Sequence, residues 1–226
     1  MYASIERVFE EANQNLQRER RRLELLQQSA QELGSYDQDG FAAMGRALSY
    51  VVMGGVLENL MRDLPSAIAA DLVALRISRS RLPIGLLSVL DAAHFRRCSG
   101  DTVQALIARA SLLRSASNHA TDGRLVENFS DLLKLADGST VGSKNFEALW
   151  MLFDMPGDWR NIPQDLLLVQ EITAKRNDVA HWLQDPVEVG RSKRPSALIK
   201  MVDQLTQLLD HVLLSLCYWF EDRLTQ

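Results

Sequence analysis

Residues 196–223 read SALIKMVDQLTQLLDHVLLSLCYWFEDR, and the predicted fold follows from their periodicity. Its large apolar side chains recur in alternating steps of four and three residues: Leu198, Val202, Leu205, Leu209, Val212, Leu216 and Trp219. This spacing follows the turn of an α-helix, so it predicts one long helix with a continuous apolar stripe. At about 1.5 Å per residue such a helix spans roughly 42 Å. We expect the stripe to lie in the core or in a seam between helices.

The same periodicity recurs in the rest of the chain. A long helix is predicted over residues 4–33 and a second over 41–64. Pro65 marks a kink or a restart, after which helical character continues to about Leu75. Shorter helices are predicted over four ranges: 86–97, 101–113, 127–136 and 145–153. No segment alternates β-branched and polar residues in the manner of a strand. We therefore predict an all-α fold, with long helices at both ends packed against a central set.

Composition limits the possible classes of protein. The 226 residues are 46% hydrophobic and 24% charged, which suits one globular domain spanning residues 1–226. No apolar run is long enough to cross a membrane, and residues 1–7 lack the apolar core of a signal peptide, so we expect a cytoplasmic protein. The net charge of −4 argues against a generally basic protein that coats nucleic acid. It leaves room for a local basic groove.

Cysteine and histidine are scattered. Cys98 and Cys217 lie far apart in apolar surroundings, and we interpret both as buried free thiols. The histidines stand at four distant positions: His94, His119, His181 and His211. A metal site needs several ligands at short spacing, so we predict neither a metal nor a cofactor.

Three features of the first two predicted helices have simple interpretations. The basic run 18–22 (RERRR) either contacts phosphates or forms a solvated helical face. Gly54 and Gly55 lower helix stability, which suggests close packing against another backbone. Glu58 precedes Arg62 by four residues, the spacing of a weak surface ion pair.

One six-residue stretch concentrates chemical groups. Arg176-Asn177-Asp178-Val179-Ala180-His181 brings a guanidinium, an amide, a carboxylate and an imidazole together in a helix predicted over 164–183. At 100° per residue, Arg176 lies within about 40° of Ile172 on the main apolar stripe. His181 lies about 140° from Arg176. The two side chains therefore do not converge on one target within a single straight helix.

The side of this helix opposite Ile172 also carries apolar groups, Leu166 and Leu167. A helix that is apolar on two sides is buried on two sides, so we expect a second protomer to cover one of them. A composite site would then collect arginine and histidine from both copies. Two simpler interpretations stay open: His181 is an ordinary helical histidine, and Arg176 is a buried arginine paired with an acid, either Glu58 or Asp178.

The stretch from Arg176 to His181 resembles the R-x4-6-H signature of the HEPN superfamily, in the form R-N-x-x-A-H. Two further segments are similar to RiboL-PSP-type HEPN proteins. They are the helix that runs from Arg46 to a central glutamate, Glu58, and the segment 145–153 before the motif helix. The resemblance covers about residues 41–183, and only the six-residue motif in it is specific.

This resemblance implies a HEPN-like helical bundle that dimerises to form a ribonuclease site. Such enzymes cleave RNA without metal, using the 2′-hydroxyl of the RNA and leaving a 2′,3′-cyclic phosphate. Toxins and phage-defence effectors are the kinds of protein in which we expect this activity, with an antitoxin or another defence protein as a possible partner. The resemblance also implies an alternative, because some family members are non-catalytic modules that bind a nucleotidyltransferase or an antitoxin. A purely structural bundle would leave the motif unexplained.

The resemblance also assigns roles within the motif. His181 would act as general base or acid, since imidazole titrates near neutral pH. Arg176 would hold the phosphate and stabilise the charge that develops in the transition state. Asn177 and Asp178 would orient these two by hydrogen bonding. Two residues of the second predicted helix would support the site: Arg46 and Glu58.

Trp182 departs from the family pattern, in which a small residue such as glycine often follows the histidine. An indole at this position has three possible roles. It stacks on a base of the RNA, packs against the core, or narrows the site.

Overall fold

The computed structural model describes residues 2–32, 40–127, 129–136, 138 and 140–225, and within these ranges it contains helices and no strand. The predicted all-α class is therefore confirmed. The α-helices are α1 (Ala3–Glu32), α2 (Phe41–Ala74), α3 (Ile84–Leu90), α4 (Ala92–Arg97), α5 (Val103–Ser117), α6 (Ser143–Phe153), α7 (Asp165–Ala180), α8 (Pro186–Arg191) and α9 (Pro195–Thr225). Two 3-10 turns, η1 (Arg79–Arg81) and η2 (His119–Thr121), accompany them.

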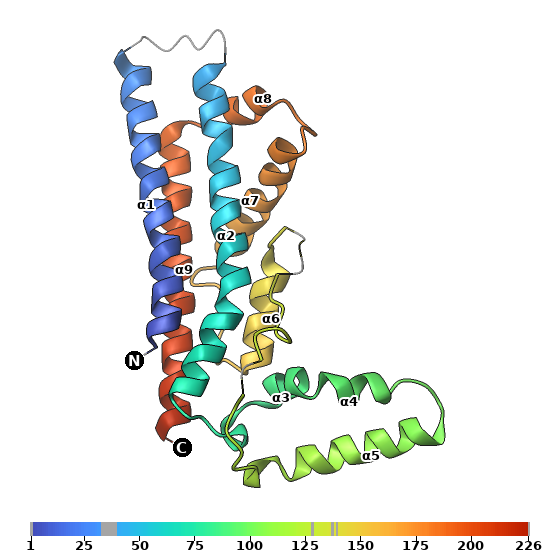
Figure 1. Cartoon of the computed structure of the whole chain (residues 1–226). Helices are drawn as coiled ribbons and strands as arrows, with labels where there is room; N and C mark the ends of the chain where they lie inside the picture. The colour runs from blue at the N-terminus through green and yellow to red at the C-terminus, as the bar shows by residue number, and fades with distance from the viewer. Residues whose placement is uncertain (1, 33–39, 128, 137, 139, 226) are drawn as a thin grey trace.

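Three long helices form the body of the molecule (Figure 1). α1 runs in the opposite direction to α2 and α9, so both chain termini lie at one end of the bundle. The predictions for residues 4–33 and 196–223 are confirmed as α1 and α9, apart from Leu33, which lies outside the described residues. The periodic side chains of α9, from Leu198 to Trp219, are all buried.

α2 is one continuous helix of 34 residues that passes through Pro65, so the predicted restart does not occur. A proline removes one backbone hydrogen bond from the helix and crowds the preceding turn. Burial offsets this cost, because Leu64, Pro65 and Ile68 are all enclosed. Tertiary packing therefore overrides the local preference of the sequence.

Polar contacts fix α1 against its neighbours. The buried carboxylate of Asp71 accepts hydrogen bonds from the backbone N–H groups of Ser4 and Ile5, at 3.2 and 3.0 Å. This satisfies donors that the first turn of a helix leaves free. Nearer the other end of α1, the Nε of Arg20 donates to Asp203 of α9 at 2.8 Å.

The basic run 18–22 contributes to these contacts. Arg22 donates to the buried Glu19 at 2.8 Å and to Ser49 of α2 at 2.9 Å. Together with Arg20, it ties α1 to both neighbouring long helices. The interpretation of the whole run as a solvated face is therefore wrong for these two arginines.

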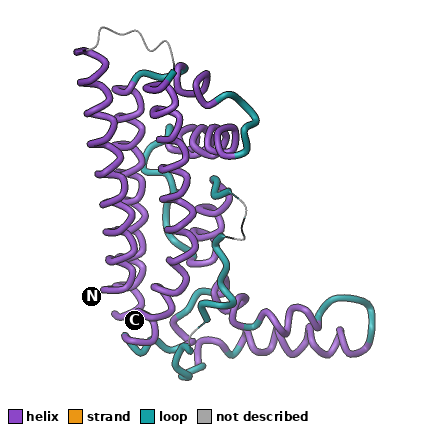
Figure 2. Tube along the Cα trace, turned by 45° about the horizontal axis from the view of Figure 1, so that its top comes forward, coloured by secondary structure: helices purple, strands orange, loops and turns teal. Residues whose placement is uncertain are grey.

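α3, α4 and α5 form an arm that projects from the end of the bundle where the termini lie (Figures 1 and 2). The helix predicted over 86–97 is divided at Asp91 into α3 and α4, and α5 extends beyond the predicted end at 113 to Ser117. At the base of the arm, Arg79 N–H donates to the carbonyl of Arg124 at 2.7 Å, and Val126 N–H donates to that of Ile77 at 2.9 Å.

The prediction of a helix over 127–136 is wrong, since the described residues of this segment form one turn, at 130–132, and otherwise irregular backbone. Leu133 and Leu135 are both buried. Two residues that are two positions apart point about 200° apart on a helix, so a helix here would expose one of them. The irregular backbone allows both to reach the bundle.

Candidate functional site

Buried polar groups position the motif helix, α7. Its first residue, Asp165, is almost fully enclosed and accepts hydrogen bonds from Ile162 N–H at 2.9 Å and from the Gln204 amide of α9 at 2.8 Å. Further along α7, Glu171 accepts from Tyr50 of α2 at 2.9 Å and from Lys193 at 2.7 Å. Burial, with the nearby charge of Glu171, raises the pKa of Tyr50. These contacts fix the rotation of α7 against α2 and α9.

Arg176 crosses α2 to reach an acid. Its Nη2 lies 2.9 and 3.0 Å from the two carboxylate oxygens of Glu58. The side chains remain 21% and 27% exposed, so this is a partly buried ion pair at the α2–α7 contact. Glu58 was one of the two acids expected for Arg176. The predicted pair between Glu58 and Arg62 is wrong, because Arg62 bonds to its neighbour Asp63 at 3.0 Å.

Gly54 makes this crossing possible. A Cβ at Gly54 would lie 2.8 Å from Cγ of Arg176 and 3.2 Å from its Cβ, whereas a Cβ at Gly55 would meet nothing within 4 Å. Close packing was therefore predicted correctly for one glycine of the pair. The neighbour is the base of an arginine side chain, not a backbone.

Thr140 completes the surroundings of the guanidinium. Nη1 of Arg176 donates to Asn177 Oδ1 at 3.2 Å and makes a longer contact with the Thr140 hydroxyl at 3.4 Å. That hydroxyl donates to the same Asn177 oxygen at 2.7 Å. No periodicity or motif in the sequence points to Thr140. Its place depends on Thr173, whose hydroxyl donates to the Val141 carbonyl at 2.8 Å and fastens the segment to α7.

α7 ends earlier than predicted. It stops at Ala180, and His181 is its C-cap residue. Trp182 N–H donates to Val179 O at 3.4 Å, and Leu183 N–H donates to Asp178 O at 2.9 Å, which is the Schellman arrangement of a helix end. Trp182 therefore takes a left-handed conformation, with φ 52°. Glycine is usual at this position because it has no Cβ to crowd.

Arg176 and His181 are separated. The arginine side chain faces α2, whereas the histidine is exposed at the end of α7. Although both residues are described, no hydrogen bond joins them. Of the predicted orienting pair, Asn177 contacts Arg176, but Asp178 binds Lys175 at 3.1 Å.

Arg46 also stands apart from this network. Its Nε donates to the Gly190 carbonyl of α8 at 2.8 Å. A Cβ at Gly190 would overlap the Ala43 backbone of α2, so α8 lies directly against that helix. Arg46 therefore fastens α8 to α2, and among the described residues it makes no contact with Arg176; its supporting role at the site stays a prediction.

The surface next to His181 is apolar. Trp182 is 73% exposed, so it does not pack against the core, and Leu183 is exposed beside it. On the second apolar side of α7, Leu167 is exposed and Leu166 is partly buried. The two-sided pattern of this helix thus leaves apolar groups uncovered in the single chain.

Among the described residues, no group of three or more His, Cys, Asp or Glu side chains could hold a metal ion.

No helix in the same part of the chain has the length and apolar character needed to cross a membrane. Cys98 and Cys217 are free thiols, as predicted, but both are only partly buried, so the prediction that they are buried is wrong. No family model, curated protein or solved structure matches this chain.

Proposed function

We propose that the protein is a metal-independent endoribonuclease of the toxin or phage-defence kind, active as a homodimer. The observation that carries the proposal is the setting of Arg176 in the resembling motif. Glu58, Asn177 and Thr140 hold its guanidinium in place and leave about a fifth of the side chain exposed. His181 lies free at the end of the same helix.

The reaction needs one base, one acid and one anion-binding group. His181 accepts the proton of the RNA 2′-hydroxyl as that oxygen attacks phosphorus, and the bond to the 5′-oxygen breaks. His181 of the partner subunit donates a proton to the leaving 5′-oxygen. Arg176 donates hydrogen bonds to the non-bridging oxygens as their charge grows. The products are a 2′,3′-cyclic phosphate and a 5′-hydroxyl.

A dimer is supported by the outer face of α2. Phe41, Met44 and Leu48 are exposed at helical spacing, and Val52 and Gly55 continue the same stripe. The opposite face of α2 is buried in the bundle. Glu58 flanks the stripe on the side of α7. A second copy lying on the stripe would therefore stand next to the ion pair of Arg176.

Cleavage of labelled RNA in EDTA tests the proposal. We expect Arg176→Ala and His181→Ala each to lower the cleavage rate by about 100-fold or more, as the loss of an acid–base or anion-binding group does. Matched controls are Arg62→Ala, an exposed arginine of α2, and His94→Ala, an exposed histidine of α4. Both controls should keep wild-type activity.

Far-UV circular dichroism checks that each variant is folded, because Arg176→Ala also leaves Glu58 without its partner. A wild-type protein that does not cleave RNA contradicts the proposal. Undiminished cleavage by both folded motif variants also contradicts it.

A second candidate is a non-catalytic module that binds a nucleotidyltransferase or an antitoxin, and the arm favours it. α5 buries only Ala105 among its fifteen residues. Four of its large side chains form a stripe that is 55–70% exposed: Val103, Leu106, Ile107 and Leu113. Isolated apolar side chains are common on surfaces, but a continuous exposed stripe is typical of interaction sites.

Co-purification separates the two candidates. A nucleotidyltransferase or an antitoxin that binds stoichiometrically, with no RNA turnover, would support the second. The substitutions Leu106→Ser and Ile107→Ser should then abolish binding while the protein stays folded. RNA cleavage by the isolated protein would support the first candidate.

A further inference from the structure

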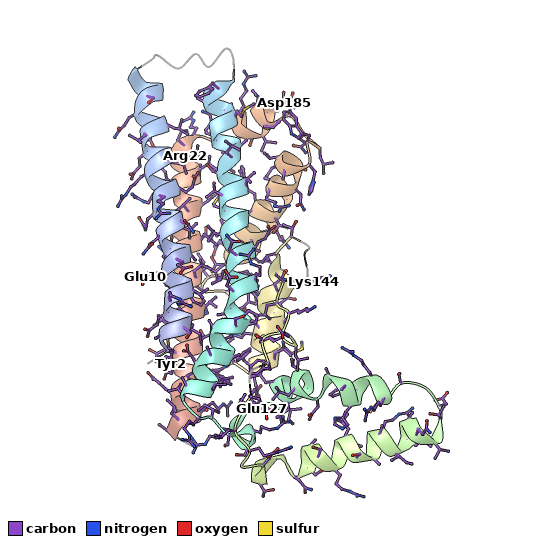
Figure 3. All side chains as sticks on the ribbon, viewed as in Figure 1. Tyr2, Glu10, Arg22, Glu127, Lys144 and Asp185 are labelled. Atoms are coloured by element: carbon purple, nitrogen blue, oxygen red, sulfur yellow. The ribbon has the colours of Figure 1, made fainter. Side chains whose placement is uncertain are left out.

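A hollow of about 510 Å³ opens beside the Arg176 network. It lies between α6, α7 and the segment that precedes α6, and Figure 3 labels one of its rim residues, Lys144, on α6. Ligand sites for small molecules have volumes of roughly 300–1,000 Å³, so the hollow has room for a nucleotide.

The residues that line the hollow suit a ligand with a negatively charged group and a sugar. Two exposed lysines, Lys134 and Lys144, stand in it, and no described residue of the lining is a carboxylate. Five further polar side chains line it. Ser143 and Gln170 offer a hydroxyl and an amide, whereas Thr140, Asn145 and Thr173 already make hydrogen bonds within the chain. Lysine ammonium groups bind phosphate as point charges, and hydroxyl and amide groups suit ribose and base edges. Leu135, Ala148 and Ala174 add apolar surface.

The hollow is connected to the candidate site in two ways. Thr140 lines it and also contacts Arg176 and Asn177. Ala174 lines it and shares a helical face with His181, because seven residues are close to two full turns. The distance along α7 between these two residues is about 10 Å, or about three stacked nucleotides at ~3.4 Å each.

We propose that this hollow is an RNA subsite, which binds a nucleotide about three positions from the bond that is cut. Lys134 and Lys144 contact the phosphate backbone, and Ser143 and Gln170 contact the ribose and the base. The position relative to the cut rests on the proposed ribonuclease function. The class of ligand rests only on the lining.

The test is binding of a fluorescent 2′-O-methyl oligonucleotide, measured by anisotropy. This RNA analogue lacks the attacking 2′-hydroxyl, so binding is measured without cleavage. We expect the double variant Lys134→Glu/Lys144→Glu to bind about tenfold more weakly or worse. Its salt dependence should also be shallower, by about 0.7 per lost lysine contact. The matched control Lys200→Glu, an exposed lysine of α9 outside the hollow, should bind within about twofold of wild type.

A steric variant separates occupation of the hollow from long-range attraction. Ala174→Trp fills the hollow without changing charge, and the exposed position tolerates a large side chain. We expect it to weaken binding as the double lysine variant does. Adenosine 5′-monophosphate should compete with the oligonucleotide more strongly than inorganic phosphate, since phosphate makes only the lysine contacts.

Three results would overturn the proposal. They are wild-type protein that does not bind the oligonucleotide, lysine and tryptophan variants that bind like wild type, and inorganic phosphate that competes as well as the nucleotide. Failure of the ribonuclease proposal is a different result. A protein that binds through the hollow but cuts no RNA retains the subsite without the activity.

Discussion

At the scale of single residues, the candidate site depends on a glycine. Gly54 is the point where Arg176 crosses α2, and Glu58 stands one turn further along the same helix. The atoms that a side chain at Gly54 would meet are the Cβ and Cγ of Arg176. These atoms are fixed to the α7 backbone, so they cannot swing away as the end of a long side chain can.

Gly54→Ala and Gly55→Ala should therefore have opposite effects on stability. Alanine favours a helix over glycine by about 1 kcal/mol, and Gly55→Ala should gain roughly this amount because its Cβ meets no atom of its own chain within 4 Å. Gly54→Ala should lose about 1–3 kcal/mol, as overpacked sites do. Urea unfolding measures both free energies. Equal stabilisation of the two variants would show that Arg176 does not pack on Gly54.

The partner of Arg176 was predicted as one of two acids, Glu58 or Asp178, and the rest of its surroundings was not predicted. Glu58 could be suggested because both residues fall in predicted helices and carry opposite charges. Thr140 could not be, since it lies in a non-helical segment whose path is fixed by the distant Thr173. The contact of Arg46 with α8 could not be predicted for a similar reason. Its acceptor is a backbone carbonyl, which every residue carries.

Among the helices, the long amphipathic ones were predictable, whereas the ends of shorter ones such as α5 and α7 were not. α1 and α9 expose one face and bury the other, so periodicity in the sequence gives their bounds closely. α2 is apolar on both sides, so the periodicity of its sequence does not show which side packs inward. The segment 127–136 has apolar residues in numbers that suit a helix. Their spacing suits an irregular chain that follows the bundle surface.

The end of α7 gives a prediction about Trp182. A left-handed conformation costs a residue with a Cβ roughly 1–2 kcal/mol, and glycine avoids this cost. Trp182→Gly should therefore be about 1 kcal/mol more stable than Trp182→Ala, because both remove the indole but only glycine removes the Cβ. Thermal unfolding of the two variants checks this difference. Equal stability would mean that the strain is relieved in another way.

The same two variants also test whether the indole of Trp182 stacks on a base of the RNA. Both lack the ring, so a stacking role predicts that they lose RNA affinity equally. If Trp182→Gly and Trp182→Ala differ in RNA affinity, the backbone conformation at the end of α7 affects binding. Unfolding therefore measures the backbone strain at Trp182, and RNA binding measures the contribution of its ring.

At the scale of the whole molecule, the proposed dimer rests on the outer stripe of α2. Leu48→Glu would place a charge in the middle of that stripe, where burial of an unpaired carboxylate is costly. We expect it to convert a dimer into a monomer, measured by light scattering at micromolar concentration. The control is Leu25→Glu, which changes a similarly exposed leucine of α1. A wild-type protein that is already a strict monomer would remove both the dimer and the composite site.

The arrangement of the chain ends has a practical consequence. Both termini and the arm lie at one end of the bundle, and the loop with His181 lies at the α8 end (Figure 1). α9 alone spans roughly 46 Å from its start to its end. An affinity tag or a fused reporter at either terminus would sit beside the arm and far from the loop. A protein immobilised through its tag would then offer His181 to RNA while crowding α5. Assays for a partner of the arm call for attachment through a surface cysteine placed near α8.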